Sequence, residues 1–311
     1  MNEKIKRFLS PALLFLAAVI WGLAFVAQDE VGEVPPFSLG LGRSILAAVF
    51  LSILIPIFDR VRKSERRLIF AHGVGLNRFE LVGGAIAGVF LAIASAMQQF
   101  GINSGTDGGK AAFITALYVV IVPIYALVLK KRASINVYIG VGIAAVGFYL
   151  LCIKGDLSIT PSDLWVVGCA LLFPIQILAI DIFSPKSDGL RMSLVQFTTA
   201  AAVNALFAIF IEGGIDVSSM WKNALPVIYL GIGSSGIAYT LQILGQRGVD
   251  PSAASVILSL ESVFGAIGTA LLLGQTLSMR EYIGCAIVLS AVIITQIEPK
   301  AFKKPKAKHT K

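Results

Sequence analysis

Long apolar stretches, separated by short polar ones, run along the whole chain. Each stretch is about 20 residues long, which is the length that a helix needs to cross the hydrocarbon core of a bilayer. A transmembrane β-barrel would instead show short segments in which apolar and polar residues alternate. The pattern predicts an all-α integral membrane protein with ten transmembrane helices, over residues 8–28, 35–58, 81–102, 111–129, 136–153, 164–183, 192–211, 225–246, 252–274 and 282–297.

The polar segments between these stretches are too short to form a soluble domain. The longest covers residues 59–78, and residues 299–311 form a short basic tail. The composition agrees, because 56% of the residues are hydrophobic and 14% are charged, whereas soluble domains carry about a quarter charged residues. Since the first stretch is too long for the apolar region of a signal peptide, we expect it to remain as a membrane helix.

Lysine and arginine residues are concentrated in alternate loops. They cluster before the first predicted helix, between the second and third, at Lys130–Arg132 and in the tail. Basic loops stay in the cytoplasm, so we predict a multi-pass plasma membrane protein with both termini cytoplasmic. A net charge of +8 would also fit a nucleic-acid-binding protein. The distribution instead predicts membrane lipid as a partner of these cations and no nucleic-acid partner.

Residue types that bind metals or perform catalysis are scarce. Cys152, Cys169 and Cys285 lie in apolar stretches without C-x-x-C spacing, and His72 and His309 lie in basic polar segments. The sequence has no phosphate-binding loop of the form G-x-x-x-x-G-K-[ST] and no cluster of acidic residues. We therefore predict no metal site, no cofactor, no catalytic residue and no enzymatic activity.

The sequence carries traces of an internal repeat. A shift of 144 residues places Gln98 on Gln242, and the Tyr-Ile-Gly triplet at Tyr138 on the same triplet at Tyr282. The matched segments correspond to the third to fifth and the eighth to tenth predicted helices. A duplication with five helices in each half accounts for this spacing.

The predicted halves are residues 1–153 and 154–298, with residues 299–311 as a cytoplasmic tail. Because five is an odd number, the second half must enter the membrane upside down relative to the first. Inverted repeats of this kind place the substrate near the bilayer midplane between the halves and alternate access by rocking.

Six segments, by their order and spacing, carry a resemblance to a known family: LAAVIWGLAFVAQ, GLGRSILAA, ITALYVVIVPIYALVLKK, YIGVGIAAVGFYLL, LSLESVFGAIGTALLLGQTLS and YIGCAIVLSAVII. Together they resemble the ten-helix EamA branch of the drug/metabolite transporter superfamily. The resemblance implies a two-times-five inverted repeat that moves small organic metabolites, often outward and sometimes by exchange for protons or solutes. Ser262 and Gln275 depart from the family pattern, which commonly has proline and glutamate at these positions.

Glu261 is an acidic residue near the middle of the ninth predicted helix. An ionised side chain at that depth costs ~2.5–3.5 kcal/mol, so we expect it to face a cavity, pair with a cation or stay protonated. We assign Glu261 to proton coupling, and the alternative is a structural contact between helices. Ala254, Gly265 and Gly268 share its helix face and should leave space beside the carboxylate.

Arg43 lies in the outer half of the second predicted helix. An arginine there can bind a substrate carboxylate through two hydrogen bonds, pair with Glu261, or extend to the outer interface. We assign it to the substrate site. Asp181, at the cytoplasmic end of the sixth predicted helix, is interpreted as a solvated helix-end residue.

Polar and aromatic residues near helix centres complete the predicted site. Gln98 and Gln242 can line the pathway or form hydrogen bonds between helices. Aromatic residues away from the membrane interfaces can form a pocket wall or simply pack. The predicted substrate-binding residues are Arg43, Gln98, Gln242, Trp21, Tyr118, Tyr239 and Phe264.

These features favour a secondary active transporter, and an exporter within that class. One interior cation and one interior anion suit a zwitterion such as an amino acid, moved by alternating access with proton coupling. The alternatives are a facilitative exchanger or importer of another metabolite, a membrane-embedded enzyme and a lipid-handling protein. The small-molecule substrate is the expected partner, and a monomer is compatible with the sequence.

Overall fold

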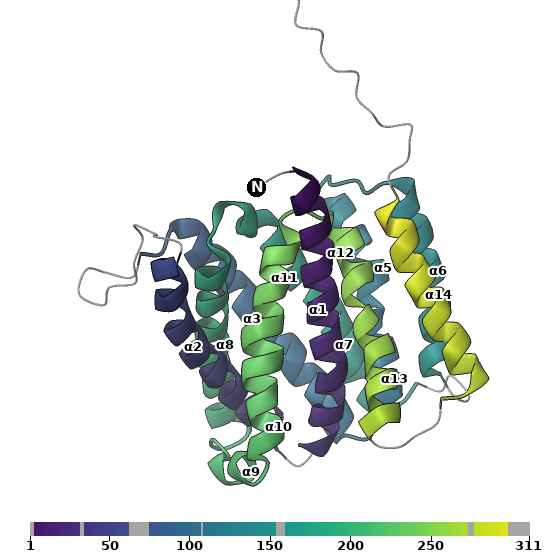
Figure 1. Ribbon diagram of the computed structural model, residues 1–311. Helices are drawn as coiled ribbons and strands as arrows, with labels where there is room; N and C mark the ends of the chain where they lie inside the picture. Colours follow the sequence, from purple (N-terminus) through teal and green to yellow (C-terminus); the bar gives the residue numbers. More distant parts are fainter. Residues whose placement is uncertain are drawn as a thin grey trace, which may run out of the picture.

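The computed structural model describes residues 3–31, 34–61, 75–106, 108–153, 159–272 and 277–297, and over these residues it is all-helical. Within them, ten helical segments are long and apolar enough to cross a membrane, which confirms the ten predicted spans. The spans stand side by side in one bundle (Figure 1). The basic tail, Gln275, His72 and His309 lie outside the described residues.

Seven spans are single helices: α1 (Glu3–Glu30), α2 (Pro36–Val61), α3 (Arg78–Asn103), α6 (Ile135–Cys152), α7 (Pro161–Phe183), α8 (Gly189–Ile211) and α14 (Met279–Gln296). Three spans are composed of shorter pieces: α4 (Gly108–Ala116) with α5 (Tyr118–Val128), α10 (Ala224–Ile228) with η2 (Tyr229–Ala238) and α11 (Tyr239–Gln246), and α12 (Pro251–Leu258) with α13 (Leu260–Leu272). Two short helices, η1 (Ser184–Lys186) and α9 (Val217–Lys222), lie in connections.

The helices form a central group with one pair on each side. In Figure 1, α6 and α14 lie together at one side of the bundle and α2 and α8 at the other. Between these pairs, α1 contacts α11 and α13, and α3 contacts α7. The central helices are therefore the ones that can enclose a site.

Small residues allow α6 and α14 to approach closely. A Cβ atom added at Gly147 would lie 2.7 Å from the Cγ2 atom of Val288, and one added at Gly284 would lie 2.6 Å from the backbone nitrogen of Leu151. Close approach through glycine is a common way for membrane helices to associate. The α6/α14 pair is thus packed backbone to backbone.

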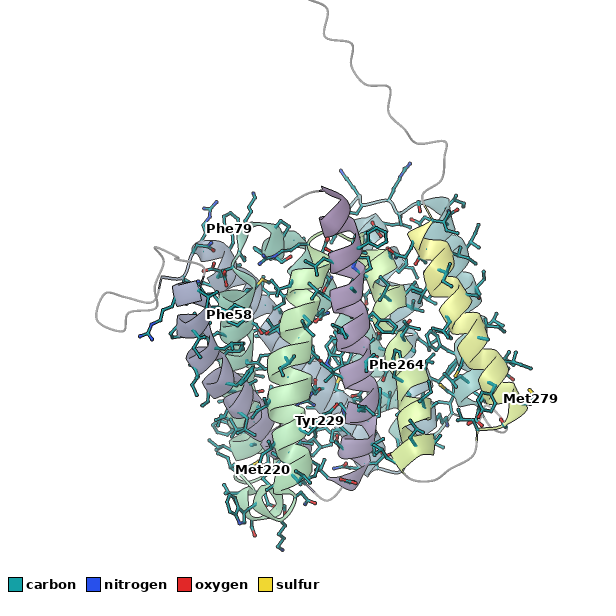
Figure 2. All side chains as sticks on the ribbon, viewed as in Figure 1. Phe58, Phe79, Met220, Tyr229, Phe264 and Met279 are labelled. Carbon is teal, nitrogen blue, oxygen red and sulfur yellow. The ribbon has the colours of Figure 1, made fainter. Side chains whose placement is uncertain are left out.

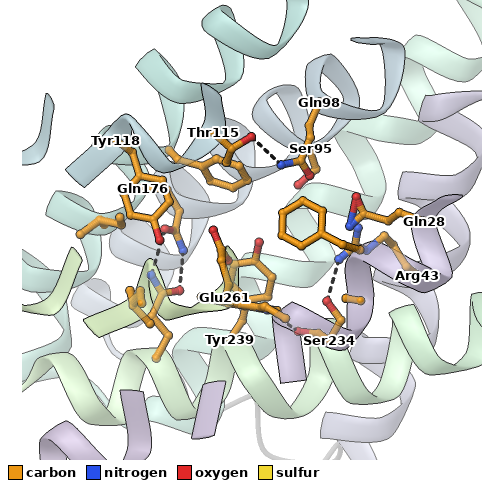
Figure 3. A pocket seen from close by; sticks show the side chains of 17 residues that line it. Gln28, Arg43, Ser95, Gln98, Thr115, Tyr118, Gln176, Ser234, Tyr239 and Glu261 are labelled. Atoms are coloured by element: carbon orange, nitrogen blue, oxygen red, sulfur yellow. Dashed lines mark hydrogen bonds between the residues drawn. The ribbon is translucent and has the colours of Figure 1, made fainter. Parts of the chain in front are cut away.

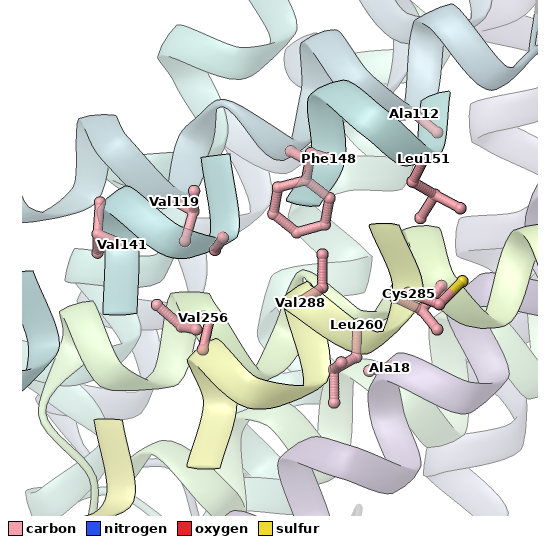
Figure 4. Close-up of a cluster of buried hydrophobic side chains, with 14 of the residues drawn as sticks. Ala18, Ala112, Val119, Val141, Phe148, Leu151, Val256, Leu260, Cys285 and Val288 are labelled. Atoms are coloured by element: carbon pink, nitrogen blue, oxygen red, sulfur yellow. The ribbon is translucent and has the colours of Figure 1, made fainter. Parts of the chain in front are cut away.

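A buried apolar cluster attaches this pair to the central helices. Phe148 of α6 and Val288 of α14 pack in it with Val119 of α5, Val256 of α12 and Leu260 of α13 (Figure 4). These five side chains are at least 97% buried. Dispersion contacts of this kind stabilise helix association where lipid removes the hydrophobic driving force.

The helix α2, which carries Arg43, is fixed to α8 at both ends. At its start, Glu212 accepts hydrogen bonds from the backbone nitrogens of Phe37 (2.7 Å) and Ser38 (2.9 Å), where the helix dipole favours an anion. Near its other end, Asp59 forms a buried ion pair with Arg191 at 2.7 Å. Arg43 therefore lies on a helix whose position is well defined.

Two spans are interrupted near their middle. The ninth span breaks at Ser259, where Ser255 and Ser259 donate side-chain hydrogen bonds to carbonyls three residues earlier, and such bonds compete with regular helix geometry. Ser262 stands where the family commonly has proline, which can interrupt a helix. The span is interrupted nevertheless, three residues earlier, at Ser259. The fourth span breaks at Leu117, whose nitrogen donates to the Ile114 carbonyl in a tightened turn.

The outer surface of the bundle is apolar. Large hydrophobic side chains such as Ile53, Val146 and Ile293 are exposed there, as expected for residues that face lipid. Figure 2 places Phe79 at the end of the bundle where the chain begins, and Met220 and Met279 at the opposite end. The charged groups of Arg78 and Lys186 lie over the Phe79 ring, 4.9 and 5.0 Å from its centroid.

Candidate functional site

A cavity lies among the central helices. Counting all the space between protein atoms together with its open mouth, it holds about 550 Å³. Its lining residues are Trp21, Ala24, Phe25, Gln28, Arg43, Ser95, Gln98, Thr115, Tyr118, Phe173, Gln176, Ile177, Ser234, Tyr239, Gln242, Leu258 and Glu261 (Figure 3). Six of the seven predicted substrate-binding residues are brought together here with Glu261.

Phe264 is the predicted residue that does not line this cavity. Its ring packs edge-on against Phe15, with centroids 5.3 Å apart and an interplanar angle of 88°. Its Cβ atom lies against Gly22 of α1, where an added Cβ would be 2.4 Å away. Phe25 and Phe173 instead provide aromatic wall.

Arg43 is held by two neighbouring serines. Its Nε donates to Ser235 Oγ at 3.0 Å and its Nη2 donates to Ser234 Oγ at 3.1 Å. Among the described residues, no ion pair joins Arg43 to Glu261. Because a guanidinium group has five N–H donors, these two hydrogen bonds leave three that can serve a ligand.

Both serines belong to η2, a ten-residue π-helix. Trp21 Nε1 donates to the Ser234 carbonyl at 3.1 Å, so the same residue positions the indole and the guanidinium. The GIGSSG segment also packs closely against α2, since a Cβ at Gly231 would lie 2.6 Å from Leu46. Two adjacent serines in an apolar span were the sequence signal for this role, and π-helical segments are frequent at functional sites.

Glu261 lies in the first turn of α13, directly after the break at Ser259, and not in the middle of a continuous helix. It is 8% exposed, and the Tyr118 hydroxyl interacts with its carboxyl group. The interruption therefore places the carboxyl group at the cavity, beside the Tyr118 hydroxyl.

The expected space beside Glu261 is not formed by its glycine neighbours. Gly265 and Gly268 pack against α1, and a Cβ at Gly268 would lie 2.9 Å from Leu23 Cδ2. Their small size allows the α1–α13 contact, because helices with glycine at the crossing can approach closely. The cavity reaches Glu261 from the side of Tyr118 and Leu258 instead.

The two matched glutamines have different partners. Gln98 Nε2 donates to Thr115 Oγ1 at 2.9 Å, whereas Gln242 and Gln176 exchange two hydrogen bonds of 3.1 and 3.3 Å (Figure 3). Thr115 and Gln176 were not among the predicted site residues. Their signal was a polar side chain inside an apolar span, which the sequence alone cannot distinguish from packing.

The aromatic wall includes a close ring pair. Trp21 and Tyr239 have centroids 4.5 Å apart at an interplanar angle of 57°. Tyr239 also contacts Phe197 edge-on at 5.6 Å. These rings provide a rigid apolar surface next to Arg43.

A buried layer separates the cavity from the end of the bundle where the chain begins. Leu14, Val122, Ile177 and Ile257 pack together in it, and Gln246 Nε2 donates to the Ile177 carbonyl at 3.1 Å. Ile177 also lines the cavity, so this layer borders it directly.

Asp181 lies beyond this layer and differs from its sequence interpretation. Its side chain is only 14% exposed, and it forms an ion pair with Lys131. The pair connects the segment after α5 to α7, so Asp181 joins two spans and is not merely solvated.

Comparison with known proteins agrees with this architecture. The model of the EamA-like transporter family matches residues 9–153 and 160–297. An uncharacterized transporter of Archaeoglobus fulgidus is 28% identical over 297 residues, which cover 95% of this chain and 88% of the relative. The uncharacterized inner membrane transporter YedA of Escherichia coli is 22% identical over 91% of this chain and 89% of its own length.

A solved crystal structure has the same fold. It superposes with a TM-score of 0.73 at 18% sequence identity, over 92% of this chain and 95% of that chain. The ten apolar spans and the inner membrane relatives together identify a multi-pass plasma membrane transporter. Because the family model covers nearly all of the sequence, the chain belongs to the EamA-like transporter family.

Proposed function

We propose that this transporter exports a small zwitterion, such as an amino acid, by proton-coupled alternating access. The observation that carries the proposal is the placement of Arg43 and Glu261. They line one small cavity, and among the described residues no ion pair joins them. An interior cation and an interior anion kept apart match the two charges of a zwitterion.

Arg43 binds the substrate carboxylate. Its three remaining N–H donors include enough for a bidentate contact, which is the arrangement that arginine forms best with carboxylates. Ser234 and Ser235 fix the plane of the guanidinium before the substrate arrives. Preorganisation of this kind lowers the entropic cost of binding.

The substrate ammonium group occupies the other end of the cavity. The π faces of Trp21 and Tyr239 attract a cation, and the Glu261 carboxylate neutralises it. The same carboxylate can be neutralised by a proton. Because proton and ammonium compete for one group, binding of one favours release of the other, which is the behaviour that exchange transport requires.

Alternating access follows from the inverted repeat. We assign residues 1–153 and 154–298 to the two halves, with both termini in the cytoplasm, and the cavity lies between spans of both. The buried layer and the Lys131–Asp181 ion pair would then lie on the cytoplasmic side. Release to the outside and loading from the cytoplasm require this layer to form and separate in turn.

Thermal unfolding of the purified protein tests this function. A ligand raises stability by RT ln(1 + [L]/Kd), so amino acids should raise Tm in a concentration-dependent manner, whereas simple amines, organic acids and nucleosides should not. Arg43→Lys should abolish the shift and leave the Tm of the unliganded protein unchanged. Arg60→Lys is the control, because Arg60 lies on the same helix and is exposed.

Two results would contradict the proposal. If organic acids or nucleosides stabilise the protein and amino acids do not, the substrate is not a zwitterion. If Arg43→Lys unfolds the unliganded protein, Arg43 has a structural role and the carboxylate assignment loses its basis.

A further inference from the structure

A second pocket lies at the end of the bundle where the chain begins, between α1, α6, α12 and α14. The buried layer separates it from the central cavity. Val249 lines this pocket and packs against the layer, and Ala253 lines it next to Ala254 of the layer. On the other side, Ile177 and Leu258 belong to the layer and also line the cavity. A passage between the two spaces therefore has to cross only this layer.

Gln246 is a polar residue at this boundary. It ends α11, one helical turn after Gln242 of the cavity, and Asp250 of the pocket follows four residues later. Residues four positions apart share one face of a helix, so Gln242 and Gln246 lie on the same face of α11. Gln246 is 2% exposed, and its Nε2 donates to the Ile177 carbonyl at 3.1 Å. Polar groups thus follow one another from the cavity, past the layer, to the pocket.

The side-chain oxygen of Gln246 lacks a partner. Its Oε1 is buried and accepts no hydrogen bond within the part of the chain that the structure describes. An unsatisfied buried acceptor is costly, above all where lipid keeps water away. Water removes this cost when the layer separates, because the oxygen then finds donors. The amide therefore destabilises the closed layer relative to the open one.

We propose that Gln246 lines the passage between the central cavity and this end of the bundle, and that its unsatisfied oxygen favours opening of the layer. The inference rests on the proposed function, which requires the layer to separate. A purely structural role predicts the opposite effect. If the hydrogen bond to the Ile177 carbonyl serves to hold α11 against α7, removal of the amide loosens the layer instead of closing it.

Thiol labelling measures the opening and needs no substrate. Ser95→Cys places a reporter on the wall of the central cavity. The three native cysteines are buried, so the protein without the reporter gives the background. A charged, membrane-impermeant methanethiosulfonate is added to sealed vesicles that expose the end where the chain begins, which labelling of Arg60→Cys identifies, since Arg60 is exposed at the end of α2. The labelling rate then follows the population in which the layer is open.

Gln246→Met replaces the amide by an apolar side chain of similar length. We expect the labelling rate from this end to fall about tenfold, the order of effect of one unsatisfied buried acceptor. In vesicles that expose the opposite end, the rate should not fall, because the population with a closed layer grows.

Gln196→Met is the matched control. Gln196 of α8 is also fully buried, and both of its amide atoms lack hydrogen-bond partners among the described residues. It lines neither the cavity nor the pocket. Its replacement should therefore leave the labelling rate unchanged.

Gln246→Glu tests the opposite direction. A carboxylate is more costly than an amide in the closed layer, so the labelling rate from this end should rise, and most at high pH, where the carboxyl group is ionised. This variant also decides the question if Gln246→Met does not fold. Unchanged labelling of Gln246→Glu overturns the proposal, because opening then does not depend on the side chain at this position.

The outcomes separate the passage from the proposed function. Equal or faster labelling of Gln246→Met from this end overturns the inference and leaves Gln246 as a contact between α11 and α7. If the reporter is labelled only at the background rate from this end while Gln246 is intact, the layer does not open there. The proposed alternating access then fails together with the inference.

Discussion

The fourth and ninth spans occupy corresponding places along the chain, yet they carry different chemistry. A shift of 144 residues places Leu117 on Glu261. Both spans are interrupted close to these residues, at Leu117 and at Ser259. The interruption in the fourth span carries an apolar side chain, whereas the one in the ninth presents a carboxyl group to the cavity. Similar interruptions of the helix thus carry a neutral side chain in one span and an ionisable group in the other.

The third and eighth spans differ in the same sense. α3 is continuous, and its Gln98 makes a single side-chain hydrogen bond to Thr115. The eighth span contains the π-helix η2, which positions Arg43 and Trp21 before the chain reaches Gln242. The eighth and ninth spans therefore bring Ser234, Gln242 and Glu261 to the cavity, and Arg43 is directed toward the serines of η2.

Among the variants that test this comparison, a substitution at the interruption of the ninth span is expected to have the largest effect. Glu261→Gln removes the ionisable proton with little change in volume, so uptake driven by a pH gradient should fall to background. Equilibrium exchange of substrate should persist, because the amide still accepts a hydrogen bond. Both activities are measured in reconstituted liposomes.

Leu117→Gln is the matched control for this experiment. It places the same amide at the corresponding interruption, and gradient-driven uptake should continue. If Glu261→Gln accumulates substrate at the unaltered level, Glu261 does not couple protons, and its role is reduced to contacts between helices.

An intermediate effect is expected when the serines of η2 are removed. The double variant Ser234→Ala and Ser235→Ala takes both fixed partners from Arg43 but keeps its charge. Hydrogen bonds to charged groups are worth ~1.5–3 kcal/mol, and part of this is recovered when the guanidinium finds water. Substrate affinity should therefore fall about tenfold, measured by calorimetry.

Thr115→Val gives the comparison on the α3 side, since it removes the neutral hydrogen bond to Gln98. We expect a loss of about two- to threefold there. The single variant Ser235→Thr retains a hydroxyl group at this position. It should therefore keep most of the substrate affinity of the unaltered protein. If Thr115→Val lowers the substrate affinity as much as the double serine variant does, the third and eighth spans do not differ in function in this way.

The smallest effect is expected at the entrances of the fourth and ninth spans, where the shift places Thr106 on Asp250. Burial raises the pKa of Asp250, and the nearby Asp181 adds to the rise. The folded state thus holds the proton more tightly than the unfolded state does. The resulting stabilisation is full at low pH and is lost as the pH rises through the raised pKa.

Asp250→Asn should cancel this pH dependence. The amide oxygen can still accept from the backbone nitrogens of Ser252 and Ala253, as Asp250 does at 2.9 and 3.3 Å. The Tm of the variant, relative to the unaltered protein, should increase as the pH is raised. The corresponding total change in the free energy of unfolding should be below about 1 kcal/mol. A difference in Tm that does not vary with pH would contradict this assignment. Thr106→Val, at the uncharged entrance, should show no such trend.

Hydropathy alone predicted the ten spans, because lipid imposes one apolar length on every crossing helix. The cost of interior charge likewise singled out Arg43 and Glu261. The break at Ser259 and the π-helix could not be predicted, since both change backbone hydrogen bonding without changing composition. This is why Ser234 and Ser235 are absent from the predicted site residues.

Helix faces explain the remaining differences. Phe264 was predicted from its place near a helix centre, but the approach of α1 at Gly22 occupies the side where its ring lies. The same close approach of α1 explains why Gly265 and Gly268 do not form the expected space beside Glu261. Which face of a helix meets which neighbour depends on tertiary packing, and a single sequence does not contain that information.

The position of Trp21 gives the protein a built-in optical signal. The chain has three tryptophans, and Trp165 and Trp221 are 45% and 81% exposed on the outer surface, away from the cavity lining. Trp21 alone of the three lines the cavity, with its indole nitrogen bonded to the Ser234 carbonyl and its ring 4.5 Å from Tyr239. Replacing the two outer tryptophans by phenylalanine would leave a single fluorophore, whose emission and quenching follow each filling and emptying of the cavity in real time.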